Sequence, residues 1–123
     1  MKKISFNEYF GIKYVIISST KEKIEKYLKK EFKHEIDMVS DALCTVLYDK
    51  RTIIISIKKE HEMNIPLFTH EAYHAVNFTC DIISSDTTGS EFECYLIQHL
   101  MIKYLTEILK VDYKNFKNNF QGF

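Results

Sequence analysis

The chain has 123 residues, of which 46% are hydrophobic and 28% are charged, and its lysines and arginines balance its aspartates and glutamates. This composition is too apolar for a disordered chain, and the length predicts one domain covering residues 1–123. Because general nucleic-acid binders usually carry a basic surplus and this chain has none, we expect no nucleic-acid partner.

The cysteines and the apolar stretches indicate a cellular compartment. The chain has an odd number of cysteines and no CxxC pair, which does not resemble a disulfide framework. The three cysteines are Cys44, Cys80 and Cys94. The start, MKKISFNEYF, has the lysines of a signal peptide without an apolar run behind them, and no apolar stretch is long enough to span a bilayer. We therefore expect a soluble, cytoplasmic protein with no membrane partner.

The first predicted elements are a strand and a helix. Residues 12–19, IKYVIISS, are rich in β-branched and aromatic side chains and predict a strand. Residues 19–32 predict a helix, with Ser19 and Glu22 spaced as a capping box. Its apolar residues fall at helical spacing and form one stripe: Ile24, Tyr27, Leu28 and Phe32.

A hairpin is predicted over residues 42–59, where two β-rich runs flank the polar turn DKR. Ile53, Ile55 and Ile57 should share one face of its second strand, since side chains alternate along a strand.

Two further helices are predicted, separated by a polar loop at residues 84–90. The first covers residues 64–78, with Asn64 or Ile65 as its cap and Pro66 in its first turn. The second covers residues 91–110. The order strand, helix, strand, strand, helix, helix predicts an α+β fold with a sheet of about three strands and helices packed on one face.

The motif HEAYH at residues 70–74 carries the clearest chemical signal. His70 and His74 lie one helical turn apart, so both imidazoles can reach one metal ion. Glu71 follows the first histidine directly, beside the metal without being forced to bind it, and from there it can act as a general base on water. Two histidines and a carboxylate suit Zn²⁺.

The opposite face of the same helix can pack on the core. Phe68, Ala72, Ala75 and Thr79 lie roughly opposite His70 on a helical projection. The chain's other histidines lack such a pattern, and we expect them at the solvated surface: His34, His61 and His99.

A catalytic zinc site usually has three protein ligands and keeps the fourth position for water. Seven downstream residues are candidates for the third ligand: Cys80, Asp81, Asp86, Glu91, Glu93, Cys94 and His99. A capping box formed by Ser90 and Glu93 would give Glu93 a structural role, but Thr88 and Glu91 fit the same pattern two residues earlier. The helical projection does not separate Glu91 from Glu93.

HEAYHAVNF followed by GSEFECYL resembles gluzincin-type zinc metallopeptidases, in particular the minimal versions found in phages and mobile elements. The resemblance covers about 30 residues, from His70 to about Leu100. It implies His70, His74 and Glu91 as zinc ligands and Glu71 as general base. The chain departs from the pattern of larger gluzincins at Tyr95, where many of them have an aspartate that acts on a histidine.

These observations lead to an expected activity and one alternative. The expected activity is that of a small zinc-dependent metallopeptidase acting on a peptide or protein, including the regulatory type that cleaves repressors or antitoxins. The resemblance also implies that the strand at residues 52–58 pairs as a sheet edge with an extended substrate, although the residues are equally compatible with a plain sheet edge that binds no substrate. The alternative is a non-catalytic, zinc-stabilised binding module with the same ligands. Glu71 argues against this alternative, because a purely structural site has no use for that carboxylate.

Overall fold

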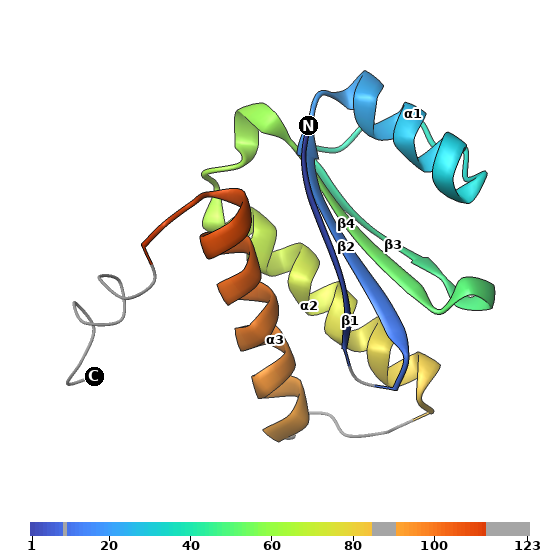
Figure 1. The fold of residues 1–123 in the computed structure, drawn as a ribbon, viewed down its shortest axis with the longest axis vertical. Coiled ribbons are helices and arrows are strands. Elements are labelled where there is room, and N and C mark those ends of the chain that lie inside the picture. The colour runs from blue at the N-terminus through green and yellow to red at the C-terminus, as the bar shows by residue number, and fades with distance from the viewer. Residues whose placement is uncertain (9, 85–90, 113–123) are drawn as a thin grey trace.

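The computed structural model describes residues 1–8, 10–84 and 91–112. They form an α+β fold in which three helices pack against a four-stranded mixed sheet (Figure 1). The strands and helices, in chain order, are β1 (Lys2–Glu8), β2 (Ile12–Ser19), α1 (Lys21–Phe32), β3 (Ala42–Leu47), β4 (Thr52–Lys58), α2 (Ile65–Ile82) and α3 (Glu91–Lys103).

The sheet has the strand order β1-β2-β4-β3. The predicted strand at residues 12–19 is confirmed as β2, and the predicted hairpin is confirmed as the antiparallel pair β3 and β4. β2 and β4 run parallel at the centre, and β1 pairs antiparallel with β2. The sheet therefore has four strands where the sequence predicted about three, because β1 was not recognised.

The helices occupy both faces of the sheet, so the prediction that they pack on one face is wrong. Ile53, Ile55 and Ile57 do share a face, and they pack with α2 and α3. Ile54 points the other way, into a second core with Ile24 and other side chains of α1. Figure 1 shows α1 on the opposite side of the sheet from α2 and α3.

The helix ends follow local capping chemistry. Asn64 caps α2, as predicted, and its side chain accepts a hydrogen bond from the Leu67 N–H at 3.1 Å. At α1 the cap is Thr20 instead of Ser19, since Ser19 is the last residue of β2. The helix predicted for residues 91–110 is shorter as a regular α-helix, because Tyr104–Ile108 continues it as a π-helical turn.

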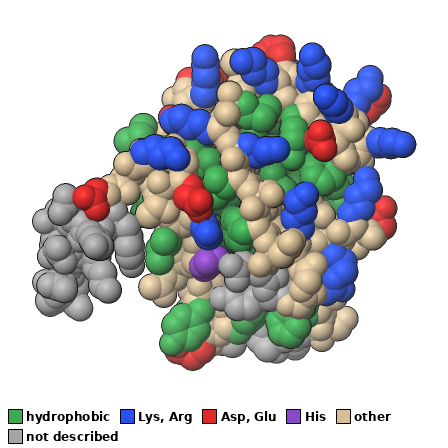
Figure 2. All heavy atoms as spheres, in the orientation of Figure 1, with side chains coloured by type: hydrophobic (Ala, Val, Ile, Leu, Met, Phe, Trp, Pro, Cys, Tyr) green, Lys and Arg blue, Asp and Glu red, His purple; other side chains and the backbone are tan. Residues whose placement is uncertain are grey.

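The described surface is charged and mixed. On the face seen in Figure 2, lysine and arginine side chains gather over the part that carries α1, with acidic side chains between them. No helix in the described ranges is long and apolar enough to cross a membrane.

Candidate metal centre

Helix α2 lies on the sheet with one face buried and the other exposed. Phe68, Ala72, Ala75 and Thr79 are all buried, which confirms the predicted packing face. His70 and His74 are exposed on the other side of the helix. The fold therefore presents the two imidazoles to solvent from a rigid element.

The two histidines converge on one point. Their Nε2 atoms lie 3.2 Å apart, and their ring centroids are separated by 4.9 Å with an angle of 78° between the rings. Zinc binds imidazole nitrogen at about 2.0–2.1 Å, so tetrahedral coordination requires two such nitrogens to be roughly 3.3 Å apart. The observed separation matches this requirement closely.

Glu71 is buried and lies near β3. It is only 8% exposed, although it lies between two exposed histidine positions. Its neighbour on β3 is Cys44: burial raises the pKa of the Cys44 thiol, and the nearby Glu71 carboxylate raises it further. Glu71 therefore lies between α2 and β3. Sequence reasoning did not associate Cys44 with this site, although the predicted hairpin placed it on a strand just before α2.

The third ligand implied by the resemblance is not brought to the histidines. Glu91 is the first residue of α3 and is exposed. Two residues later, Glu93 lies beside α2, where its Oε1 is 3.7 Å from Cys80 Sγ. Cys80 is six residues after His74, which is about 9 Å along the helix axis. The first turn of α3 thus packs beyond the histidine pair.

Among the described residues, no group of three or more His, Cys, Asp or Glu side chains could hold a metal ion. Asp81 instead accepts a hydrogen bond from the Tyr48 hydroxyl at 3.3 Å, and Cys94 is exposed on α3. Asp86 lies outside the described residues. The histidine pair is therefore placed by the structure, and the identity of the third ligand stays a prediction.

The lone histidines are less solvated than predicted. His34, His61 and His99 are all half-buried. His99 packs edge-on against Phe6 of β1, with ring centroids 5.5 Å apart, so it belongs to the contact between α3 and the sheet. His61 lies 3.2 Å from the Asp41 carboxylate. None of the three joins the pair on α2 within the part of the chain that is described.

The strand expected to pair with a substrate is not an edge. Residues 52–58 form β4, which is hydrogen-bonded to β2 on one side and β3 on the other, so that prediction is wrong. The sheet edge next to α2 is β3. Just after β3, the Tyr48 ring packs edge-on against Phe78, with centroids 6.4 Å apart. β3 therefore runs beside the same side of α2 that carries Glu71.

Comparison with known protein families, with curated proteins and with solved structures finds no match to this chain.

Proposed function

We propose that this protein is a small zinc-dependent peptidase whose metal site is built on the His70–His74 pair. The 3.2 Å separation of the two Nε2 atoms carries the proposal, because it suits one zinc ion bound by both rings. The resemblance of HEAYH to the gluzincin motif supports the same assignment. A bound zinc ion would supply a Lewis acid and lower the pKa of a water molecule at the site.

Glu71 is the proposed general base. In this role it takes a proton from the attacking water and delivers it to the leaving amine. Its place directly after His70 puts the carboxylate on the same helix as the proposed ligands, and at only 8% exposure it is shielded from bulk solvent. The histidines hold the metal on the neighbouring, exposed surface of the same helix.

The outer edge of β3, which pairs with no other described strand, is the proposed contact for the substrate. An extended peptide can add to an exposed strand through main-chain hydrogen bonds, with its side chains facing alternately up and down. A peptide paired with β3 would run beside Glu71, because Cys44 of β3 is next to that carboxylate. β3 takes over the role that the sequence assigned to residues 52–58.

Glu91 remains the proposed third ligand, with Glu93 as its competitor. Zinc affinity of the variants Glu91→Gln and Glu93→Gln separates the two, since loss of a ligand lowers affinity far more than loss of a surface carboxylate. Equal affinity in both variants and in the wild type would exclude both residues.

The first test is the metal content of the protein, purified without a histidine tag and without added zinc, and measured by mass spectrometry of the metal. We expect about one zinc ion per chain. Absence of bound metal, even after zinc is offered and the excess is removed, would overturn the proposal. With zinc bound, hydrolysis of a diverse peptide library tests the activity itself.

The competing function is a zinc-stabilised binding module without turnover. It would use the same ligands, with the fourth position closed to water. If the protein is such a module, we expect it to bind zinc stoichiometrically and zinc to raise its melting temperature. We also expect no cleavage of any peptide in the library.

A further inference from the structure

A second candidate site lies at the end of the sheet where the N-terminus of the chain and the start of α1 meet (Figure 1). It is a pocket of about 420 Å³, lined by the last residues of β2, the first turn of α1 and the segment that follows β4. This volume is within the range of roughly 300–1,000 Å³ that is typical of small-ligand sites. The pocket shares no lining residue with α2 and its histidines.

The backbone around this pocket favours an anion. β2 and β4 are parallel, and both end here, which is where open sheets with parallel strands commonly bind ligands. α1 is twelve residues long and begins here, so the positive end of its dipole faces the pocket. Thr20, which caps the helix by accepting the N–H of Lys23 at 3.3 Å, lines the pocket together with Lys23.

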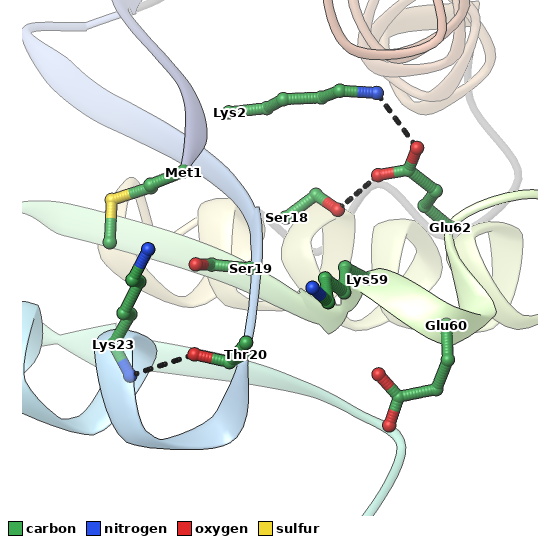
Figure 3. A pocket seen from close by; sticks show the side chains of 9 residues that line it. All are labelled: Met1, Lys2, Ser18, Ser19, Thr20, Lys23, Lys59, Glu60 and Glu62. Atoms are coloured by element: carbon green, nitrogen blue, oxygen red, sulfur yellow. Dashed lines mark hydrogen bonds and ion pairs between the residues drawn. The ribbon is translucent and has the colours of Figure 1, made fainter.

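Ser19 provides an independent observation. The residue is only 4% exposed, and it lines the pocket. Its hydroxyl makes no hydrogen bond to any residue in the described ranges, unlike the hydroxyls of Ser18 and Thr20 on either side. Figure 3 shows the Ser19 hydroxyl directed towards the side of β2 on which Met1 and Lys23 lie, with Lys59 on the other side of the strand. Because the hydroxyl reaches the pocket, it is available to a ligand or to water.

The charges of the lining side chains leave two lysines available. Three lysines and two glutamates line the pocket. Glu62 is already neutralised, because it binds the Lys2 ammonium at 2.7 Å and accepts from Ser18. Lys23 and Lys59 make no ion pair with any described residue, and Figure 3 shows the Glu60 carboxylate turned away from Ser19.

We propose that this pocket binds a phosphate group, either as inorganic phosphate or as the phosphate of a small monoester. The pocket is lined by two lysines without an ion pair, by the Ser19 hydroxyl and by the start of a twelve-residue helix. The room remaining in about 420 Å³ admits a small organic group attached to the phosphate. This site is independent of the proposed zinc chemistry.

The experiment is a titration of the full chain with inorganic phosphate, and separately with glycerol phosphate, at constant ionic strength. Amide chemical shifts in ¹H–¹⁵N spectra report the result. We expect saturable shifts centred on Ser19, Thr20 and Lys23, which line the pocket. Tighter binding of glycerol phosphate would identify a monoester as the ligand, and equal or weaker binding would identify the free ion.

Two variants and a matched control test the assignment. Ser19→Ala and Lys59→Gln should each weaken phosphate binding by about tenfold, since a hydrogen bond to a charged group is being lost. Lys26→Gln removes the same charge from α1 outside the pocket and should leave the affinity unchanged. Dispersed amide spectra of each variant exclude unfolding as the cause.

Two results would overturn the proposal. One is the absence of saturable shifts in the wild type at either ligand. The other is an equal loss of affinity in Lys59→Gln and Lys26→Gln, which would indicate a general charge effect.

Discussion

The hydroxyl of Tyr14 on β2 lies 2.8 Å from the hydroxyl of Thr79 on α2, and both side chains are buried. Thr79 also donates to the Ala75 carbonyl at 2.8 Å, so Tyr14 acts as the donor between the two residues. This contact joins the central sheet to the side of α2 that lies opposite the histidines. The contact therefore helps to fix the orientation of α2 about its own axis. This orientation determines the direction in which His70 points.

Replacing Tyr14 with phenylalanine should destabilise the protein by about 1 kcal/mol, because the hydrogen bond is lost and the ring is kept. Urea unfolding monitored by circular dichroism measures the change. Tyr27→Phe is the matched control, since the Tyr27 ring packs on Phe32 and its hydroxyl makes no hydrogen bond with described residues. An equal effect of both substitutions would contradict the role assigned to Tyr14.

The cap of α2 is the second target for mutation. Asn64→Ala removes the acceptor of the Leu67 N–H and should cost about 1 kcal/mol of stability. Asn64→Asp keeps an acceptor and should stay close to the wild type. Thermal unfolding of the three proteins ranks them; if the alanine variant melts at the wild-type temperature, the cap contributes nothing.

The ionisation of Glu62 makes the free energy of unfolding depend on pH under acidic conditions. The hydrogen bond from Lys2, and then that from Ser18, lower the pKa of this carboxyl below its ordinary 4.5. A lowered folded-state pKa contributes stability that is fully present above the unfolded-state value and is lost as pH falls through the folded-state value. Glu62→Gln should therefore lose less stability than the wild type between pH 7 and strongly acidic pH.

The comparison for that measurement is Glu60→Gln. Glu60 forms no ion pair with a described residue, so its variant should follow the wild-type pH dependence. Unfolding free energies from urea titrations at several pH values give both curves. Identical curves for the Glu62 variant and the wild type would show that the ion pair with Lys2 does not act on stability.

The fold was predictable where local pattern decides it. The run IKYVIISS and the two halves of the hairpin carry enough β-branched residues to specify strands, and Asn64 with Pro66 specifies a helix start. β1 was not predicted because only Ile4 and Phe6 alternate with polar residues there, which is a weak strand pattern. Its pairing with β2 stabilises it as a strand in the folded protein. The left-handed Gly11, at φ 74°, lies in the turn between β1 and β2 and was the available signal.

The distribution of helices over two faces depends on tertiary structure. β4 is buried on both sides, and its unbroken run TIIISI is the pattern of a strand covered on both faces. That run could have predicted that one helix would lie opposite the others. Similarly, the spacing of His70 and His74 specifies the pair locally, whereas the position of Glu91 depends on how α3 docks against α2.

Zinc binding should stabilise the folded chain through the histidine pair. At a zinc concentration of about 100 times Kd, the expected gain is about 2.7 kcal/mol, seen as a rise in melting temperature. His70→Ala and His74→Ala should each abolish the rise. His34→Gln is the control, since His34 lies far along the chain from α2. A rise of wild-type size in either α2 variant would show that zinc binds elsewhere.

Substitution of Glu71 separates catalysis from metal binding. Glu71→Gln keeps the size of the side chain and should leave zinc at the wild-type stoichiometry, while hydrolysis of a responsive peptide falls by about 10²–10⁴-fold through loss of the general base. Because Glu71 is buried beside Cys44, the melting temperature of the variant is measured in parallel to exclude a folding defect. Glu31→Gln, at an exposed position of α1, is the matched control for loss of a carboxylate. If Glu71→Gln cleaves the peptide as fast as the wild type, another group accepts the proton, and the assignment of Glu71 is wrong.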